Sequence, residues 1–440
     1  MSDNLSATYQ ALADQFTDRF RPVIQHPRII GREAEYPVVT GEGKAADVRR
    51  LWSPLLEAGD LTPVYGYAGA GREEMMVGLK GAEYNYMLEV GLGTVEINSR
   101  PCDDLFTLQA SHEQSVARLV RAAARFGWRV LGYGIQPVTK PSLPIMAPKQ
   151  RYFSLYRAMG AEWLWYTVTA SDQIQIDISR DEMVQMLNFG NLMTPILIAL
   201  CANSPVYAGQ LSPFCSAREG QMARIHASEF RHGMLARPVR DIGDFVAMMS
   251  QSVHLIQRDA DFAIPGSKPF TDYLAQHGPD LDAFLFHEHY IWNSARLRAA
   301  YSTIELRPAC QQPWNEHMAA MALSLGLIEA ATQIQSYIEA TIGDGFWEIM
   351  RTYHRYAIER GLRAPQPAPI SWRKLSNWPR KACAPRLWGR APARSDPQPT
   401  LSAGKPGATH PPHLSDRRHD ASARPHHHPP PPDRNPRLAP

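Results

Sequence analysis

Residues 28–39 read RIIGREAEYPVV, an alternating stretch that predicts a β-strand with one apolar and one polar face. Glu33 and Glu35 then point to the same side, while Ala34 and Tyr36 point to the other. Two neighbouring carboxylates repel each other unless a cation lies between them, and carboxylate oxygens are ligands for Mg²⁺. The stretch therefore predicts either a magnesium-binding strand face or, as the plainer alternative, an acidic face in contact with water.

A second acidic strand is predicted within residues 88–98, which read LEVGLGTVEIN. Glu96 stands between two β-branched apolar residues, so its side chain opposes the apolar face. Glu89 lies seven positions earlier, which on a regular strand is the opposite face. Gly91 and Gly93 supply a turn or bulge that could bring Glu89 back to the face of Glu96. A loop position without a metal is the alternative for Glu89.

Two further stretches alternate in the same way. Residues 173–178 read QIQIDI and place Gln173 on the polar face of a half-buried strand, for which an exposed surface is the alternative. Residues 303–307 read TIELR and put Glu305 and Arg307 on one face. The pair is either a structural ion pair or a metal ligand beside a phosphate-binding guanidinium, whose fork geometry suits bidentate contact.

The fold class follows from how these strands are distributed. They are separated by predicted helices of varied length, without a regular βαβ rhythm or an internal repeat, which favours α+β with an antiparallel or mixed sheet. A capping box of Ser179 with Glu182 predicts a helix start, and Pro195 predicts that this helix restarts there. Other helices are expected at residues 5–20, 45–57, 242–257, 315–342 and 347–360. The sequence contains neither a G-x-x-x-x-G-K-[ST] phosphate loop nor a Rossmann fingerprint.

The composition changes at residue 363. About 14 of the 46 Lys and Arg, but only about 4 of the 43 Asp and Glu, fall in 363–440, together with about 18 of the 37 prolines. Such a segment buries too little apolar surface to offset chain entropy, so we expect a disordered Pro/Arg/His-rich tail. One hypothesis is that a shifted reading frame replaced the normal C-terminus. The remaining residues 1–362 are mildly acidic, which argues against nucleic-acid binding by this part, although binding through the tail is an alternative.

The five cysteines bear on the compartment. Their number is odd and no Cys-x-x-Cys pair occurs, which argues against a secreted disulfide framework. The N-terminus has no basic start followed by an apolar run, so no signal peptide is expected. The strongest apolar stretch, residues 196–202, is too short to span a bilayer and predicts a buried helix. We expect a cytoplasmic protein without membrane or nucleic-acid partners, and the oligomeric state stays open.

Taken together and in order, these segments resemble the glutamate–cysteine ligase superfamily, especially its plant and bacterial branch. The resemblance covers about residues 28–345 and rests on five ordered motifs. These are Gly31-Arg32-Glu33-Ala34-Glu35; Glu89 through Glu96-Ile97-Asn98-Ser99; Arg151-Tyr152 with Thr169 to Gln173 and Asp177; Ala202-Asn203-Ser204-Pro205 with Gly209 and Ser216-Ala217-Arg218; and Arg296-Leu297-Arg298 with Tyr301 to Glu305-Leu306-Arg307.

The resemblance implies a fold, a reaction and a set of site residues. The fold would be a glutamine-synthetase-like antiparallel sheet cradle with helices on its outer side, and residues 1–362 would be the catalytic ligase domain. ATP would phosphorylate the side-chain carboxylate of glutamate, and the amine of cysteine would attack the acyl phosphate. Two or three Mg²⁺ would be held by Glu33, Glu35, Glu89, Glu96 and Glu305. Arg307 would contact phosphate, Gln173 and Arg218 substrate or nucleotide, and Arg296 either of these.

The chain also departs from the plant pattern. After Arg218 the aromatic and acidic residues usual in the plant enzymes are missing, and Ala223-Arg224-Ile225-His226 stands there. A carboxylate–amine ligase with a different amine acceptor is therefore one alternative. A non-catalytic relative that binds a nucleotide or an amino acid is another, although such a protein need not keep five carboxylates on polar faces.

Overall fold

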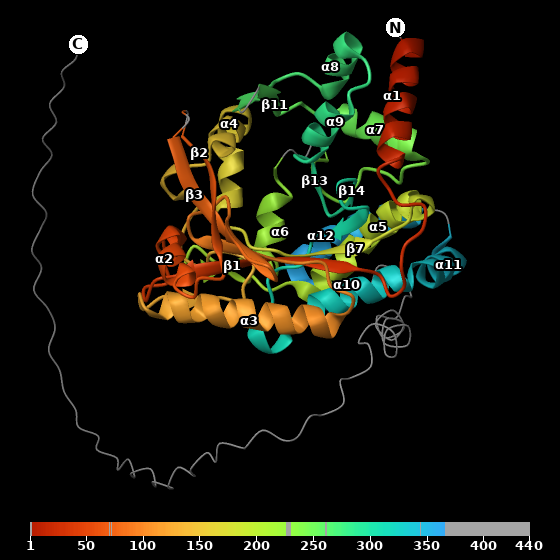
Figure 1. Ribbon diagram of the computed structural model, residues 1–440. Helices are drawn as coiled ribbons and strands as arrows, with labels where there is room; N and C mark the ends of the chain where they lie inside the picture. Colours follow the sequence, from red (N-terminus) through yellow and green to blue (C-terminus); the bar gives the residue numbers. More distant parts are fainter. Residues whose placement is uncertain are drawn as a thin grey trace, which may run out of the picture. The chain divides into compact units, whose positions relative to one another are not determined.

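The alternating stretches become strands of one antiparallel sheet in the computed structural model, which describes residues 2–365 except 70, 72, 226–229, 260–261 and 344 (Figure 1). Along the sheet the order is β14-β15-β7-β1-β5-β4-β3-β2, and β6 pairs with the end of β1. The strands are β1 (Ile30–Val39), β2 (Thr62–Ala68), β3 (Glu73–Lys80), β4 (Tyr84–Leu88), β5 (Thr94–Ser99), β6 (Arg129–Val130), β7 (Asp172–Asp177), β14 (Ala295–Arg298) and β15 (Thr303–Leu306).

Helices cover one face of this sheet. In Figure 1, α3 (Leu105–Ala124) runs beneath β1 and α10 (Ala319–Glu329) lies beneath β7. The helix α5 (Met183–Cys201) packs against β14 and β15. Ile174, Ile176 and Ile304 point toward these helices and are fully buried, because strand alternation sends every second side chain to this face. The predicted α+β class, an antiparallel sheet with helices on its outer side, is confirmed.

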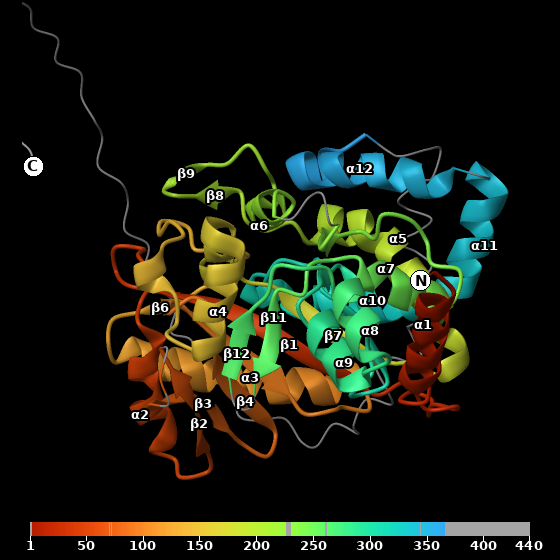
Figure 2. The ribbon, with the colours of Figure 1, turned by 90° about the horizontal axis from the view of Figure 1, so that it is seen from above.

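Shorter elements cover the opposite, polar face, as Figure 2 shows from above. Those that enclose the site described below are α4 (Gln150–Met159), η3 (Gly160–Thr167), α6 (Ala217–Met222), β10 (His232–Gly233) and β13 (Trp292–Asn293). The helix α9 (Leu281–Glu288) directly precedes residues 289–292, which also line the site. The other elements are α1 (Ser2–Thr17), η1 (Val48–Leu51), α2 (Trp52–Leu56), η2 (Leu143–Ile145), η4 (Arg180–Glu182), β8 (Val206–Tyr207), β9 (Gln210–Leu211), α7 (Ile242–Ser250), β11 (Ile256–Asp259), β12 (Phe262–Pro265), α8 (Phe270–His277), η6 (Trp314–Glu316), α11 (Ala331–Ile342), α12 (Phe346–Arg360) and η7 (Gly361–Arg363).

Three predicted helices differ from those observed. The expected helix 242–257 ends at Ser250, because residues 256–259 pair with β12 as a hairpin, and a short apolar run fits a strand as well as a helix. The expected helix 315–342 is two helices that meet at Ala330. The expected helix 45–57 is shorter, a 3₁₀ turn followed by α2. The long helix α3 and the β2–β3 hairpin were not predicted.

The helix expected to restart at Pro195 is continuous instead. The capping box of Ser179 and Glu182 is present, and α5 follows it through Pro195 to Cys201. Packing on all sides outweighs the amide hydrogen that the proline lacks. In the described part of the chain, residues 180–201 form one helix long and apolar enough to cross a membrane, and 78% of its apolar window is buried inside the protein. Such burial is typical of a core helix.

The predicted tail 363–440 falls almost entirely on residues 366–440, which lie outside the described residues. Its disorder and the reading-frame hypothesis stay predictions.

A buried ion pair joins the two central strands beneath the polar face. Arg32 on β1 donates to Asp172 on β7 through Nε (2.7 Å) and Nη2 (2.8 Å), and Nη2 also donates to the main-chain oxygen of His317 (2.7 Å). Both side chains are fully buried. The pair fixes the register in which Glu33 stands opposite Gln173.

Replacing Asp172 with alanine is expected to lower the free energy of unfolding by about 3–5 kcal/mol, because it leaves the Arg32 guanidinium buried and unpaired. Chemical denaturation measures this loss. The double variant Arg32→Met, Asp172→Val leaves no unpaired charge and should recover most of it. The exposed Glu74→Ala on β3 is the control and should be nearly neutral. A loss below about 1 kcal/mol in Asp172→Ala would show that the pair does not hold the strands together.

Candidate active site

A cavity of about 780 Å³ lies between the polar face of the sheet and the elements that cover it. Its floor comes from β1, β4, β5, β7 and β14, and its cover from α4, η3, α6 and residues 289–292. Among the described residues of its lining are Glu33, Glu35, Glu89, Glu96, Gln173, Arg218, Arg296 and Arg307. All the residues singled out from the sequence line this cavity except Glu305, which is buried beside it.

Three carboxylates meet at one end of the floor. Glu35 on β1 stands directly opposite Glu96 on β5 in the antiparallel register. Glu89 joins them because β4 and β5 form a hairpin in which Leu88 pairs with Val95. This fold-back puts residue 89 on the same face as residue 96, although a continuous strand would separate them. One oxygen from each of Glu35, Glu89 and Glu96 lies within 4.8 Å of the others.

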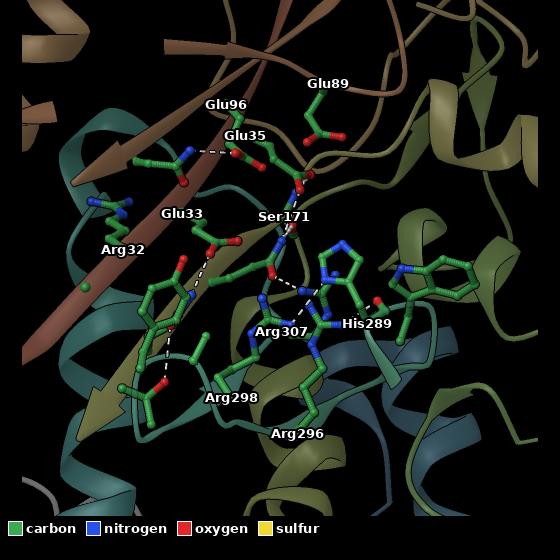
Figure 3. Close-up of a pocket in the computed structure, with 18 of the residues that line it drawn as sticks. Arg32, Glu33, Glu35, Glu89, Glu96, Ser171, His289, Arg296, Arg298 and Arg307 are labelled. Carbon is green, nitrogen blue, oxygen red and sulfur yellow. Dashed lines mark hydrogen bonds between the residues drawn. The ribbon is translucent and has the colours of Figure 1, made fainter. Parts of the chain in front are cut away.

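Neighbouring donors orient these carboxylates (Figure 3). Glu35 accepts from the main-chain N–H of Ser171 (2.6 Å) and from Gln173 Nε2 (3.0 Å). Glu96 accepts from Asn98 Nδ2 (2.7 Å), and Glu89 accepts from its neighbouring main-chain N–H at residue 90 (2.9 Å). Each carboxylate keeps at least one lone-pair direction for a further partner, since an ionised carboxylate can accept about four hydrogen bonds.

The electrostatics of this cluster favour a cation. Burial and the charge of Glu89 raise the pKa of Glu35 to about 7. Burial and the same neighbour raise the pKa of Glu96 well above its ordinary value. Three carboxylates that are costly to ionise together, with oxygens close enough to share one ion, fit a divalent metal ion with oxygen ligands such as Mg²⁺.

Magnesium affinity is expected to rise as the pH increases from 6 to 8, because protons on Glu35 and Glu96 must leave before the ion binds. A group whose pKa is raised in the folded state loses its stabilising contribution as the pH rises through that value. The metal-free protein should therefore lose stability across this range, and Mg²⁺ should restore it. Calorimetric titration and thermal unfolding with and without Mg²⁺ measure both effects. An affinity independent of pH would contradict this protonation scheme.

Arginines gather at the other end of the floor. Arg296 and Arg298 come from β14, and Arg307 directly follows β15 (Figure 3). Arg307 donates to Gln173 Oε1 and to Glu305 Oε2, the latter at 3.1 Å, and Arg296 donates to the same oxygen of Glu305. Although burial opposes its ionisation, Arg296 and Arg307 hold the pKa of Glu305 well below its usual range. Glu305 is therefore a buried negative charge that holds the arginines in place at this end of the cavity.

The five carboxylates expected to bind magnesium are thus arranged in three ways. Glu35, Glu89 and Glu96 form the cluster. Glu33 lies between the two ends, accepts from Gln175 Nε2 (2.6 Å), and has a pKa raised by burial and by the charge of Glu305. Glu305 is ion-paired with two arginines. A structural ion pair was one of the two alternatives for Glu305 and Arg307, and this ion pair is present in the structure. The roles of Glu33 and Glu305 as metal ligands stay predictions.

The cover contributes residues that the sequence reading did not single out. Trp163, Tyr166 and Trp292 line the cavity with their rings in contact, at centroid distances of 4.7 Å and 4.9 Å from Tyr166 to its two neighbours. Glu219 and His232 form a buried pair beside Arg218. None of these side chains follows a strand alternation, so only the three-dimensional arrangement reveals them.

Comparisons with known proteins place these observations in a family. Residues 57–335 match the model of glutamate-cysteine ligase family 2 (GCS2). The chloroplastic glutamate–cysteine ligase of Medicago truncatula is 25% identical over 309 residues, which are 66% of this chain and 59% of that protein. The enzyme of the same name from Arabidopsis thaliana is 26% identical over 287 residues, 61% of this chain and 53% of that protein. The chain thus spans less than two thirds of the length of these relatives.

Two solved structures are also similar. A bifunctional glutathione synthetase from Pasteurella multocida gives a TM-score of 0.42 at 13% identity, over 80% of this chain and 44% of that one. A glutamate–cysteine ligase from Francisella tularensis in complex with AMP gives a TM-score of 0.37 at 10% identity, over 83% and 94% of the two chains.

Proposed function

Because this chain belongs to glutamate-cysteine ligase family 2, we propose that it joins the side-chain carboxylate of glutamate to the amine of cysteine at the expense of ATP. One observation carries the proposal: a carboxylate cluster and an arginine cluster occupy opposite ends of the floor of a single cavity. Such a floor can hold a metal-bound triphosphate and an acidic substrate at once, without a phosphate-binding loop.

The acidic end would hold the metal and the arginine end the anions. Glu35, Glu89 and Glu96 would bind Mg²⁺, which supplies neutralisation of the phosphate oxygens and of the phosphoryl group in transfer. Arg307 is held by Gln173 and Glu305, so its guanidinium is oriented before an anion arrives. Guanidinium forks suit phosphate and carboxylate oxygens, so Arg296, Arg298 and Arg307 would contact the transferred phosphoryl group and glutamate.

The proposed reaction has two steps. A side-chain oxygen of glutamate attacks the γ-phosphorus of ATP, ADP leaves, and an acyl phosphate forms. The amine nitrogen then attacks the carbonyl carbon, an amide bond forms, and phosphate leaves. In both steps the arginines would stabilise charge that moves onto phosphate oxygens, and the covering elements would keep water from the acyl phosphate.

A related amine in place of cysteine is the second candidate acceptor. The aromatic rings of Trp163, Tyr166 and Trp292 line the cavity and offer contact area to an apolar or aromatic side chain. This candidate changes the second step only and leaves the activation of glutamate as described.

Phosphate release from ATP with Mg²⁺, glutamate and a panel of amines tests the proposal. The panel holds cysteine, apolar and aromatic amino acids, and hydroxylamine, which attacks acyl phosphates and traps them as hydroxamates. Release that requires both glutamate and an amine, with glutamyl hydroxamate formed from hydroxylamine, supports an acyl-phosphate ligase, and the best amine identifies the acceptor. Protein that is folded by circular dichroism but shows no glutamate-dependent release with any amine would refute the proposal.

A further inference from the structure

A buried glutamate–histidine pair opens onto the cavity beside Arg218. Glu219 lies in the first turn of α6, where it is 1% exposed and ion-paired with Arg218. His232 lies on β10, and its side chain is 7% exposed and lines the cavity. The Nε2 atom of His232 lies 3.1 Å from Oε2 of Glu219. The two residues are thus linked by a hydrogen bond between separate elements of the cover.

The protonation of this pair follows from its partners. Burial alone would raise the pKa of Glu219, but Arg218 and His232 lower it to about 2, so the carboxylate is ionised and can only accept. When the imidazole carries a single hydrogen, the ionised carboxylate places that hydrogen on Nε2, and Nδ1 carries the free lone pair. Among the described residues, Nδ1 of His232 is buried and has no hydrogen-bond partner. An oriented imidazole with a free lone pair, on a residue that lines a substrate cavity, is the arrangement of a general base.

The other charged and titratable groups around His232 favour this assignment. The charge of Arg218 is balanced by Glu219. His354 on α12 lies close to Gly233, and burial lowers its pKa to about 4, so it is neutral near pH 7. His289 also lines the cavity, but its Nδ1 lies 3.5 Å from Arg298 Nη1. Burial and the charges of Arg296 and Arg298 lower the pKa of His289 well below its ordinary value, which makes it a poor proton acceptor.

We propose that His232 is the general base that takes a proton from the ammonium group of the acceptor, with Glu219 as the positioning residue that orients its imidazole. This inference rests on the proposed ligase function and adds the residue that makes the nucleophile. The ammonium loses one proton to Nδ1 and becomes a neutral amine. The amine nitrogen attacks the carbonyl carbon, the bond from that carbon to the phosphate oxygen breaks, and the nitrogen gives a second proton to the departing phosphate.

The variant His232→Gln separates this role from a structural one. The glutamine amide can replace Nε2 as a donor to Glu219 but has no basic lone pair at the position of Nδ1. Hydroxylamine is uncharged near neutral pH and needs no base, whereas an amino acid arrives as an ammonium ion. We expect His232→Gln to lower the rate with the best amino-acid acceptor by at least about 10²-fold near pH 7, and the rate of hydroxamate formation by less than about threefold. The deficit should shrink as the pH rises and the acceptor loses its proton unaided.

A second variant and a matched control complete the test. Glu219→Gln should show the same selective loss of amino-acid ligation, to a smaller extent, because the imidazole keeps its lone pair but loses its orientation. His354→Gln alters a buried histidine of the same cluster that does not belong to the described lining of the cavity, and it should change neither rate by more than about threefold.

The outcomes distinguish this inference from the function on which it rests. If His232→Gln lowers both rates equally, or neither, then His232 is not the base. If the wild-type protein forms no hydroxamate at all, the ligase function itself fails.

Discussion

Replacing Glu96 with glutamine is expected to abolish most of the activity and, at the same time, to leave the metal-free protein at least as stable as the wild type. Turnover should fall by at least about 10²-fold, because one of three oxygens that would hold Mg²⁺ loses its charge. Glutamine fits the site, since its amide oxygen can still accept from Asn98. Magnesium-dependent phosphate release measures the loss.

The effect on stability has the opposite sign for a physical reason. Burial and the charges of Glu89 and Glu33 raise the pKa of Glu96, so ionising this residue in the folded protein costs free energy. That cost increases as the pH rises through the folded-state pKa. Glutamine does not ionise, so the variant has no such cost. Without Mg²⁺ at pH 8, Glu96→Gln should therefore melt at or above the wild-type temperature, and adding Mg²⁺ should stabilise it less than the wild type.

The exposed Glu42→Gln is the matched control and should leave turnover and melting temperature unchanged. Normal turnover in Glu96→Gln, or a lower melting temperature without Mg²⁺, would show that the cluster is structural and not a metal site. Lost activity with retained stability is expected for a residue that is needed for function and lowers the stability of the folded protein.

The central strands of the sheet and their polar face could be predicted from the sequence because they depend on a period of two. The alternation around Glu33, Glu35 and Glu96 was enough to place their side chains on one face, whichever strands paired. Gln173 followed the same rule. Alternation along one strand does not determine which residues of the adjacent strands lie beside these side chains. That Glu35 stands opposite Glu96 depends on a register that only the complete sheet determines.

Other parts of the site depend on contacts that local patterns do not determine. Gly91 and Gly93 indicated a turn after Glu89, but the position of Glu89 in the cluster depends on the pairing of the two strands that flank this turn. Glu219 and His232 are 13 residues apart, on a short helix and a two-residue strand without periodicity. The strand of His232 forms only by parallel pairing with β13, far along the chain. Long-range pairings of this kind are decided by packing and not by propensity.

Replacing Glu305 with glutamine is expected to give the opposite pattern to Glu96, with a large loss of stability. Glu305 is fully buried between Arg296 and Arg307, whose side chains are 7% and 14% exposed. Glutamine would leave both guanidinium groups without their counter-charge in a buried setting. The free energy of unfolding should fall by about 3–5 kcal/mol, as measured by denaturant titration near pH 7. Activity should fall as well, because Arg307 loses one of the two partners that orient it.

The pH dependence and a matched variant separate this ion pair from a general effect of burial. A carboxylate whose pKa is depressed in the folded state stabilises the fold above its unfolded-state value, about 4.3, and this contribution is lost as the pH falls below it. The difference in the free energy of unfolding between wild type and Glu305→Gln should therefore shrink below about pH 4.

Glu288 is the control, because it is buried near the same arginines but its pKa is raised by burial, so Glu288→Gln should lower the free energy of unfolding only slightly. Equal losses in Glu288→Gln and Glu305→Gln would mean that burial alone, and not the pairing with two arginines, decides the outcome. A larger loss of stability in Glu305→Gln than in Glu288→Gln would instead establish that the Glu305 carboxylate stabilises the arginine end of the cavity. This end would then differ from the cluster around Glu96, where the negative charges lower the stability of the metal-free protein.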